Sequence, residues 1–431
     1  MRDIVVLIFL IACIVAALKK PWWGALSLAV FSYLNPHAYA WGAVRSLPVY
    51  YVLFLVVAVS TFNTKDKQPI PKDWRIPTFL TLWVYFIFTS TQSPLPDIAW
   101  SKFWFVTKVF IPFYFTWVLI NTREKLYYLI STIGASIGIV AVKGGTFAIL
   151  TGFSHRVYGP PSTQFEDNNL FAVAMLIAIP LILVWEKEVK QGWLRKGILF
   201  SIPVIYAASL SSWSRGALLT MIALTFTLIS NSKRKYLMIP LVIGGAFFVI
   251  PYLPEEWFGR MHTMESYEED TSAMSRIEAW TDGWNHALSH PFTGAGFDGW
   301  IHVTMRDWHS SYVEMLAEHG FIAFGLWISL ILGSVFNLTS LARQAKRIEG
   351  MEWVGHYSLM VRTSLVCYMV GTAFLGLSYW DLLYHLVFIS VLIKKFALQE
   401  FSEKALIDEQ ANKKSQKNIG FASHRLKLQN K

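Results

Sequence analysis

Long apolar runs recur along almost the entire chain and constrain its fold more than any other feature. A helix that crosses the hydrocarbon core of a membrane needs about 20 mostly apolar residues. Soluble proteins carry about 25% charged residues, whereas the 431 residues of this chain are 54% hydrophobic and only 15% charged. We therefore predict an all-α polytopic membrane protein with about 12–13 transmembrane helices. The apolar runs lie near residues 4–18, 22–34, 48–62, 76–90, 98–120, 126–150, 169–185, 198–212, 216–230, 236–252, 320–340, 358–376 and 382–394.

Basic residues are concentrated in alternate connections between these runs. Because Lys and Arg near helix ends remain in the cytoplasm, we assign these connections to the cytoplasmic side. The other connections are then external, and the first short segments put the N-terminus outside, which leaves the orientation of the first helix open. The basic connections are 65–75, 123–125, 187–196, 233–235 and 343–347. The expected external connections are 35–47, 91–97, 151–168, 213–215, 253–319 and 377–381.

One external connection is much longer than the others and forms a large loop. The formal net charge of +10 does not indicate nucleic-acid binding, because the basic residues lie in short clusters and in the C-terminal tail rather than on a folded basic domain. The expected regions are N-terminal transmembrane helices (1–160), a second group of transmembrane helices (161–252), the large loop (253–319), C-terminal transmembrane helices (320–394) and a cytoplasmic basic tail (395–431).

We expect neither a disulfide nor a metal site. Cys13 and Cys367 both lie inside apolar runs. The acidic run Glu268-Glu269-Asp270 has no histidine or further carboxylate at the spacing of metal ligands. The sequence therefore predicts no metal and no cofactor.

The large loop contains one predicted helix, near residues 273–289. Ser272 can cap its N-terminus, and the His290-Pro291 pair ends it, because proline lacks an N–H and restricts the residue before it. Its apolar residues recur at helical spacing, so one face is suited to lie on the membrane or on the bundle. These residues are Met274, Ile277, Trp280 and Trp284.

External arginines are few, so each requires an explanation. Arg215 lies in a tight connection, where it is either a snorkelling arginine at a helix end or an anion ligand that faces an external cavity. Arg276 is either part of a surface ion pair with Glu278 or a second anion ligand. Several guanidinium groups outside the membrane would suit a phosphate, whose oxygens they bind bidentately. The further candidates are Arg156, Arg260 and Arg306.

His309 immediately precedes a helix that we expect to begin near Ser310, with Ser311 and Glu314 as a capping box. The positive end of this helix dipole disfavours an imidazolium, and a neutral ring can accept a proton as a general base. The alternative is an interfacial histidine bonded to loop backbone. The histidines without a comparable setting, which we expect to be structural, are His290, His302 and His319.

Two further polar positions adjoin apolar runs. Lys143 either lines the cavity or neutralises a carboxylate. The segment Asp167-Asn168-Asn169 either caps the helix that follows or provides Asn168 for hydrogen bonding to a substrate.

Four segments, in their order and spacing, resemble the superfamily of bacterial O-antigen ligases and Wzy-type polymerases. His309-Ser310, followed by nine residues and Gly320, resembles its His-(Asn/Ser/Gln)-x9-Gly signature. Ser214-Arg215-Gly216 resembles its Ser-Arg-Gly segment. The large-loop pattern of the superfamily is matched by Arg276, Trp280, His290-Pro291 and Gly294-Ala295-Gly296.

The resemblance covers roughly residues 160–380, so we expect 161–252 to be the ligase core. Asp167-Asn168-Asn169 takes the place of a more usual Pro-Asn. At the N-terminus, Asn35-Pro36-His37 and Trp41-Gly42 resemble the subgroup of exosortase-A-associated O-glycosylation ligases.

The resemblance implies a GT-C-like glycosyltransferase of the bacterial inner membrane, active in lipopolysaccharide or related polysaccharide biosynthesis. Its donor would be a glycan on undecaprenyl pyrophosphate at the periplasmic face, and its acceptor a hydroxyl on lipid A–core or on protein. Arg215 and Arg276 would bind the pyrophosphate without a metal, because its departure develops negative charge. His309 would orient or deprotonate the acceptor, and direct displacement would invert the anomeric centre. The other expected substrate contacts are Arg156, Arg306, Asn168 and Lys143.

Two other functions remain open. A Wzy-type polymerase would extend the repeat unit itself and give a ladder of products. A flippase for a lipid-linked glycan would explain a polar cavity without chemistry, although flippases more often show internal repeats and polar residues in both membrane halves.

Overall fold

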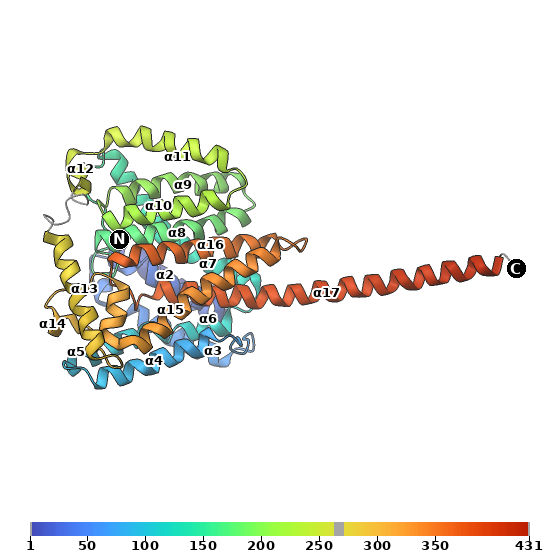
Figure 1. Ribbon diagram of the computed structural model, residues 1–431, viewed down its shortest axis with the longest axis horizontal. Helices are drawn as coiled ribbons and strands as arrows, with labels where there is room; N and C mark the ends of the chain where they lie inside the picture. Colours follow the sequence, from blue (N-terminus) through green and yellow to red (C-terminus); the bar gives the residue numbers. More distant parts are fainter. Residues whose placement is uncertain (1, 263–270, 430–431) are drawn as a thin grey trace.

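The computed structural model describes residues 2–262 and 271–429, and this part of the chain folds entirely into helices and loops (Figure 1). The predicted all-α fold is therefore confirmed for the described residues. The first half contains α1 (Arg2–Lys19), α2 (Pro21–Tyr33), the 3-10 helices η1 (Pro36–Tyr39) and η2 (Ala43–Ser46), α3 (Val49–Asn63), α4 (Arg75–Thr91), α5 (Pro96–Phe110), α6 (Phe113–Leu119), α7 (Arg123–Leu150), α8 (Asn168–Glu188) and α9 (Gly192–Leu210). The second half contains α10 (Arg215–Asn231), α11 (Lys235–Val249), the 3-10 helix η3 (Ile250–Tyr252), α12 (Glu255–His262), α13 (Thr271–Ser289), α14 (Trp300–Val303), α15 (Ser311–Ala345), α16 (Glu352–Gly371), the 3-10 helix η4 (Thr372–Phe374) and α17 (Asp381–Gln429).

Four helices within the described ranges are long and apolar enough to cross a membrane: α7, α8, the segment Lys235–Tyr252 and α15. Other apolar runs form shorter helices, such as α3 with 15 residues and α10 with 17. The run 98–120 is divided at Pro112, between α5 and α6, because proline cannot donate the backbone hydrogen bond that would continue the helix. The chain is thus a multi-pass membrane protein, while the number of about 12–13 spans stays a prediction.

Helix α8 forms the centre of the bundle. Every residue from Phe171 to Leu181 is buried, as expected for a helix that is apolar on all sides. It packs between α7, α9 and α16. Small residues allow the neighbouring backbones to approach closely: a Cβ atom added at Gly145 of α7 would lie 2.0 Å from the carbonyl oxygen of Val204 in α9.

The connections gather at two opposite ends of the bundle (Figure 1). The end that carries α12–α14 is called the loop end, and the end from which α17 leaves is called the tail end. At the loop end, the Ser93 hydroxyl donates to the carbonyl of Ala295 at 2.8 Å, which joins two expected external connections. At the tail end, Lys125 pairs with Asp66 at 2.9 Å, which joins two basic connections. The expected external and basic connections thus separate in space.

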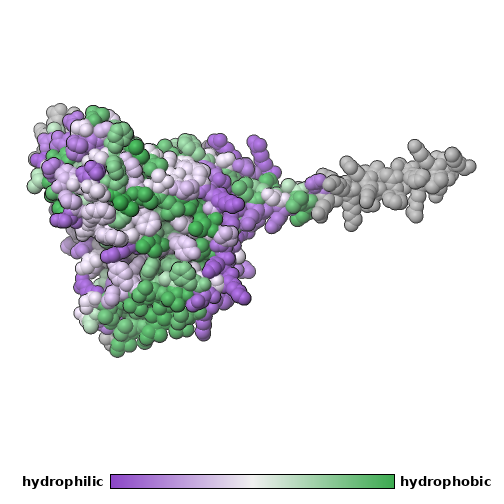
Figure 2. Space-filling model, turned by 90° about the horizontal axis from the view of Figure 1, so that it is seen from below, coloured by the Kyte–Doolittle hydropathy of each residue, from purple (hydrophilic) through white to green (hydrophobic). Residues whose placement is uncertain are grey.

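Apolar side chains also cover much of the outside of the bundle. Helix α11 buries none of its residues, and Phe247 is 81% exposed. Figure 2 shows one face, on which hydrophilic residues gather where α17 leaves and apolar residues cover much of the surface between the ends. An apolar exterior of this extent is what a lipid-facing surface requires.

A buried ionic group ties three helices together at the tail end. The fully buried Arg75 of α4 donates to Asp73 at 2.7 Å, to Ser334 of α15 at 3.2 Å and to Ser390 of α17 at 2.5 Å. Lys394 donates to the other carboxylate oxygen of Asp73 at 2.9 Å. Burial opposes ionisation of Asp73, but the hydrogen bonds and charge of Arg75, aided by Lys394, outweigh it and lower the pKa of Asp73.

Candidate functional site

The turn between α9 and α10 carries Arg215 at the loop end. Trp213 in this turn has a φ of +56°, a conformation that non-glycine residues rarely adopt. Ser214 caps α10, because its hydroxyl accepts a hydrogen bond from the N–H of Ala217 at 3.3 Å. The chain reverses within these residues, so that Arg215 is the first residue of α10, with a half-buried side chain.

Three side chains from other segments hold this turn. The amide of Asn168, at the start of α8, donates to the carbonyl of Ser212 at 2.7 Å. Arg260 of α12 donates from Nε to the carbonyl of Trp213 at 3.0 Å. The guanidinium of Arg156 lies over the ring of Trp213, 5.1 Å from its centroid. The turn is therefore fixed from the loop before α8, from α8 itself and from α12.

These contacts gather three of the predicted arginines around one turn: Arg156, Arg215 and Arg260. Guanidinium groups present planar donors that match the oxygens of a phosphate. The chemistry of this cluster is thus that of an anion site at the loop end.

The segment Asp167-Asn168-Asn169 performs two tasks. The Asp167 carboxylate caps α8 by accepting from the N–H groups of Asn169 and Leu170, at 2.9 and 2.8 Å. The predicted capping of the helix is therefore confirmed. Asn168, only 7% exposed, is directed to the turn before Arg215 instead.

Phe374 of η4 joins three segments that are distant in the sequence. A Cβ atom added at Gly216, the residue after Arg215, would lie 3.4 Å from the Cβ of Phe374. The ring of Trp280 on α13 lies 6.2 Å from the ring of Phe374, measured between centroids. Trp280 also donates from Nε1 to the carbonyl of Trp308 at 2.7 Å. Phe374 therefore links the start of α10 to α13, and Trp280 of α13 in turn binds the residue before His309.

His309 is exposed and lies just before α15, whose N-cap is Ser310. Its φ is +45°, and its N–H donates to the Asp307 carboxylate at 3.0 Å. In contrast, His319 is fully buried and its Nδ1 is hydrogen-bonded to the Thr89 hydroxyl at 2.6 Å. His319 thus has the structural setting that we expected, while the imidazole of His309 is accessible.

The predicted capping box at the start of α15 is wrong. The Ser311 hydroxyl donates to the carbonyl of Leu375 at 2.8 Å, and the Glu314 carboxylate accepts from the N–H of Ser378 at 2.9 Å. Both side chains bind the segment between η4 and α17 rather than the first turn of their own helix. Ser311 and Glu314 therefore form tertiary contacts here instead of capping α15.

Gly320 interrupts α15 with a φ of +74° and a ψ of −175°. A Cβ atom at this position would lie 2.4 Å from the carbonyl oxygen of Pro291. The freed backbone groups are satisfied by the segment after α13: Phe321 donates to Pro291 at 2.8 Å, and Gly296 donates to Glu318 at 2.8 Å. Only glycine suits both the positive φ and the close approach.

Two other predicted residues lie at the edge of this region. Arg306 forms an ion pair with Glu278 of α13, and both side chains are more than half exposed. Glu278, which we had considered as a partner of Arg276, thus pairs with Arg306. Lys143 is exposed on α7, and its Nζ lies 5.1 Å from the centroid of the Tyr39 ring in η1. This contact places Lys143 against the N-terminal segment.

The sequence reasoning missed an acidic pair on α15, in which Glu318 is buried and Glu314 is half-buried. Glu318, 1% exposed, accepts from Trp308 Nε1 at 3.1 Å and from the Tyr379 hydroxyl at 2.7 Å. Glu314 lies one turn nearer to His309. Two carboxylates four residues apart at the start of an apolar run were the available signal.

Among the described residues, no group of three or more His, Cys, Asp or Glu side chains could hold a metal ion. The acidic run Glu268–Asp270 and the predicted loop segment around it lie outside the described residues. Cys13 and Cys367 are both buried and unpaired with each other.

Comparison with known families divides the chain into two parts. Residues 197–328 match the family model described as O-Antigen ligase. Residues 1–190 match a family of unknown function. No curated protein matches the chain. The O-antigen ligase match contains Arg215, Arg276, His309 and Gly320, whereas Asn168 lies in the other part. The exosortase-associated subgroup stays a prediction. The chain thus contains a domain that matches the O-antigen ligase family.

Proposed function

We propose that this protein is an inverting glycosyltransferase of the O-antigen ligase type, which transfers a glycan from undecaprenyl pyrophosphate to an acceptor hydroxyl. A chain of contacts carries this proposal: Phe374 links the start of α10 to α13, the helix of Arg276, and Trp280 of α13 binds Trp308, just before His309. Acyl-chain or redox chemistry would not require arginines and a histidine in this arrangement.

The arginines form the donor half of the proposed site. Arg215 and Arg276 bind the pyrophosphate and stabilise the negative charge that develops on it as the glycan leaves. Asn168, Arg156 and Arg260 position Arg215 by holding its turn. Arg306 and Lys143, at the edge, are proposed to contact the glycan.

His309 forms the acceptor half. The acceptor oxygen attacks C1 of the glycan from the face opposite the pyrophosphate, while its proton passes to the imidazole of His309. The bond between C1 and the pyrophosphate oxygen breaks, and undecaprenyl pyrophosphate leaves with the electron pair. This single displacement inverts the anomeric centre and needs no cofactor.

The proposal includes the surroundings of the site. The protein is a GT-C-like enzyme of the bacterial inner membrane with about 12–13 spans, and its loop end faces the periplasm. This orientation follows from the basic residues at the tail end, which favour the cytoplasmic side. The acceptor is a hydroxyl on lipid A–core or on protein. A Wzy-type polymerase would use the same donor and the growing glycan as acceptor.

The direct test supplies the purified protein in nanodiscs with an undecaprenyl-pyrophosphate glycan and candidate acceptors, in buffer that contains EDTA. Released undecaprenyl pyrophosphate and glycan product are measured for wild type and His309→Ala. We expect the variant to lose about 10²- to 10⁴-fold of the acceptor-dependent rate, the usual contribution of a general base.

His302→Ala is the matched control, since His302 is an exposed histidine on α14 in the same loop. It should retain the wild-type rate. Equal rates for His309→Ala and wild type would remove His309 from the chemistry. Donor binding without release, with any acceptor, would indicate a flippase instead. A single added block would identify a ligase, and a ladder of repeat units would identify a polymerase.

A further inference from the structure

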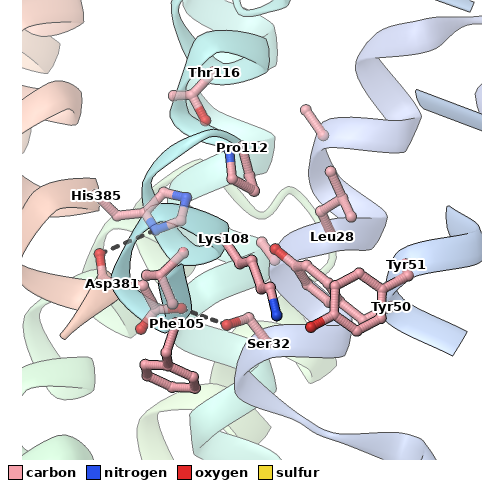
Figure 3. A pocket seen from close by; sticks show the side chains of 13 residues that line it. Leu28, Ser32, Tyr50, Tyr51, Phe105, Lys108, Pro112, Thr116, Asp381 and His385 are labelled. Carbon is pink, nitrogen blue, oxygen red and sulfur yellow. Dashed lines mark hydrogen bonds between the residues drawn. The ribbon is translucent and has the colours of Figure 1, made fainter. Parts of the chain in front are cut away.

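A second polar cavity lies in the first half of the bundle, away from the Arg215 turn. It has a volume of about 230 Å³ and lies between α2, α3, the α5–α6 junction and the start of α17 (Figure 3). This volume would hold roughly seven waters at about 30 Å³ each, or one small headgroup. One wall is apolar and is formed by Ala25, Leu28, Ala29 and Val109. The polar residues in the lining are Ser32, Tyr50, Tyr51, Lys108, Thr116, Asp381 and His385.

The cavity lies at the depth of the membrane, well away from the tail end of the bundle. Asp381 begins α17, and Lys394, which binds Asp73 at the tail end, follows 13 residues later. At 1.5 Å per residue this separation is about 20 Å, within a hydrocarbon core of about 30 Å. Ionisable side chains at such a depth are rare, and they usually mark a functional site.

Two opposite charges line this cavity without neutralising each other. The Asp381 carboxylate accepts a hydrogen bond from Ser32 and lies in the first turn of α17, where the helix dipole favours a negative charge. Lys108 reaches into the cavity from α5, with Nζ 5.8 Å from the centroid of the Tyr51 ring (Figure 3). Within residues 2–262 and 271–429, neither Asp381 nor Lys108 has an ion-pair partner. The cavity therefore offers an anionic and a cationic group for one ligand.

The cavity opens on the side of the bundle. At its mouth, Lys108 is exposed, and Tyr51 and Phe105 are 48% and 45% exposed. The neighbouring helices α2 and α3, with 13 and 15 residues, are only about 20 and 22 Å long. A bilayer adapts to such short helices by local thinning, which brings lipid headgroups closer to the cavity.

We propose that this cavity binds the headgroup of a zwitterionic phospholipid that carries a primary ammonium and a phosphate. Lys108 binds the phosphate, Asp381 accepts from the ammonium, and the apolar wall contacts the first carbons of the lipid chains. An anionic headgroup without a cation would leave Asp381 unpaired and repelled. A quaternary ammonium has no N–H to donate to Asp381, and a neutral sugar would leave both charges without a partner. The proposal does not depend on the glycosyltransferase activity.

The test measures lipid retention by the purified, delipidated full-length protein. Phosphatidylethanolamine, phosphatidylglycerol or phosphatidylcholine with identical chains is added, and bound lipid is counted by native mass spectrometry after washing. We expect one phosphatidylethanolamine to be retained, in preference to the other two lipids. Asp381→Asn and Lys108→Gln should each weaken this retention about tenfold or more, because each removes one charge of the pair.

Lys235→Gln is the matched control, because Lys235 also lies on an apolar helix, with its ammonium 5.3 Å from the centroid of the Tyr236 ring. This variant should retain phosphatidylethanolamine like the wild type. Lys108 is exposed, so a monodisperse Lys108→Gln protein keeps the test valid if Asp381→Asn does not fold. Equal retention of phosphatidylglycerol, with an effect of Lys108→Gln only, would overturn the proposal in favour of a simple anion site. Retention unaffected by both substitutions would also overturn it.

Discussion

Arg215 is held by its neighbours in a way that makes its guanidinium, and not only its charge, important. The turn before it is fixed by Asn168, Arg156 and Arg260, so the first residue of α10 has a defined position. A planar guanidinium binds two phosphate oxygens at once, whereas the ammonium of lysine is a point charge. The position of Arg215 and the donor geometry of its guanidinium thus both fit its proposed role, the bidentate binding of a pyrophosphate.

The Arg215→Lys variant tests this geometry. We expect the transfer rate to fall about a hundredfold, as for loss of one preorganised donor in a transition state. Arg45→Lys is the control, since Arg45 is exposed and donates to the Ser162 hydroxyl in loops of the same end. Full activity of Arg215→Lys in the glycan-release assay would contradict bidentate binding.

Asn168 is predicted to act through the same turn. In Asn168→Ala the carbonyl of Ser212 loses its buried partner, which destabilises the protein by about 1–3 kcal/mol, and Arg215 loses its fixed position. Thermal unfolding and the transfer rate should both decrease. Asn169→Ala is the comparison. Among the described residues, the Asn169 side chain hydrogen-bonds only to its neighbour Asp167, at 3.5 Å, so its removal should leave both measurements near wild type. A wild-type transfer rate in Asn168→Ala would show that the turn before Arg215 keeps its conformation without the hydrogen bond from Asn168.

At the scale of single elements, the break in α15 separates two functions of one helix. The part before Gly320 carries Glu314 and Glu318, which bind the surrounding loops, and the part after it continues as an apolar membrane helix. The segment after α13 replaces the hydrogen bonds that the break removes. The loop end and the membrane bundle are therefore connected by backbone hydrogen bonds as well as by side chains.

Gly320→Ala should destabilise this junction. The added Cβ would meet the Pro291 carbonyl, and the combination of φ +74° and ψ −175° costs a non-glycine residue about 1–3 kcal/mol before that clash is counted. Gly325→Ala, five residues later in the same helix, has open space around its Cβ and should stabilise the helix by up to about 1 kcal/mol. Thermal unfolding of both variants in the same detergent provides the measurement. Equal melting temperatures for Gly320→Ala and Gly325→Ala would mean that α15 can adopt a conformation at residue 320 that accepts alanine.

The C-terminal end of α13 is predicted to weaken in acid. Burial lowers the pKa of His286, and the charge of the neighbouring His290 lowers it further. The centroids of the two rings lie 4.4 Å apart. The Nε2 atom of His286 has no hydrogen-bond partner among the described residues. Because the folded value lies below the unfolded value of about 6.5, the unfolded state binds the proton more readily. Stability is therefore complete above pH 6.5 and decreases as the pH falls through that value.

Hydrogen exchange of peptides that cover α13 and the following turn would measure this effect at pH 7.5 and 5.5, after correction for intrinsic rates. Wild type should lose protection at pH 5.5, and His286→Gln should lose less. His302→Gln, which changes an exposed histidine of the same loop, should behave like wild type. An identical loss in His286→Gln would assign the pH dependence to another group.

For the molecule as a whole, the local patterns of the sequence predicted the helices better than they predicted the tertiary contacts between them. Apolar runs and basic connections predicted the helices and the two ends of the bundle. The positions of Arg215 and His309 beside helix starts also followed from short motifs. No local pattern could predict that Phe374 connects the start of α10 with α13, because that contact depends on how α16 and η4 pack against both helices.

Some local patterns were also misleading for physical reasons. The helix that we expected to begin near Ser310 does begin at Ser311, but the sequence pattern did not predict the break at Gly320 within it. The Ser311–Glu314 pair had the spacing of a capping box, yet both side chains found partners beyond their own helix. In each case, tertiary hydrogen bonds form in place of the local ones.

The hydrogen bond from Asn168 to Ser212 crosses the boundary between the two family regions. Residues 1–190 provide the amide, and residues 197–328 provide the carbonyl just before Arg215. The region of unknown function thus contributes a buried contact to the proposed site. A recombination event that exchanged one region without the other would therefore separate the turn before Arg215 from a residue that holds it.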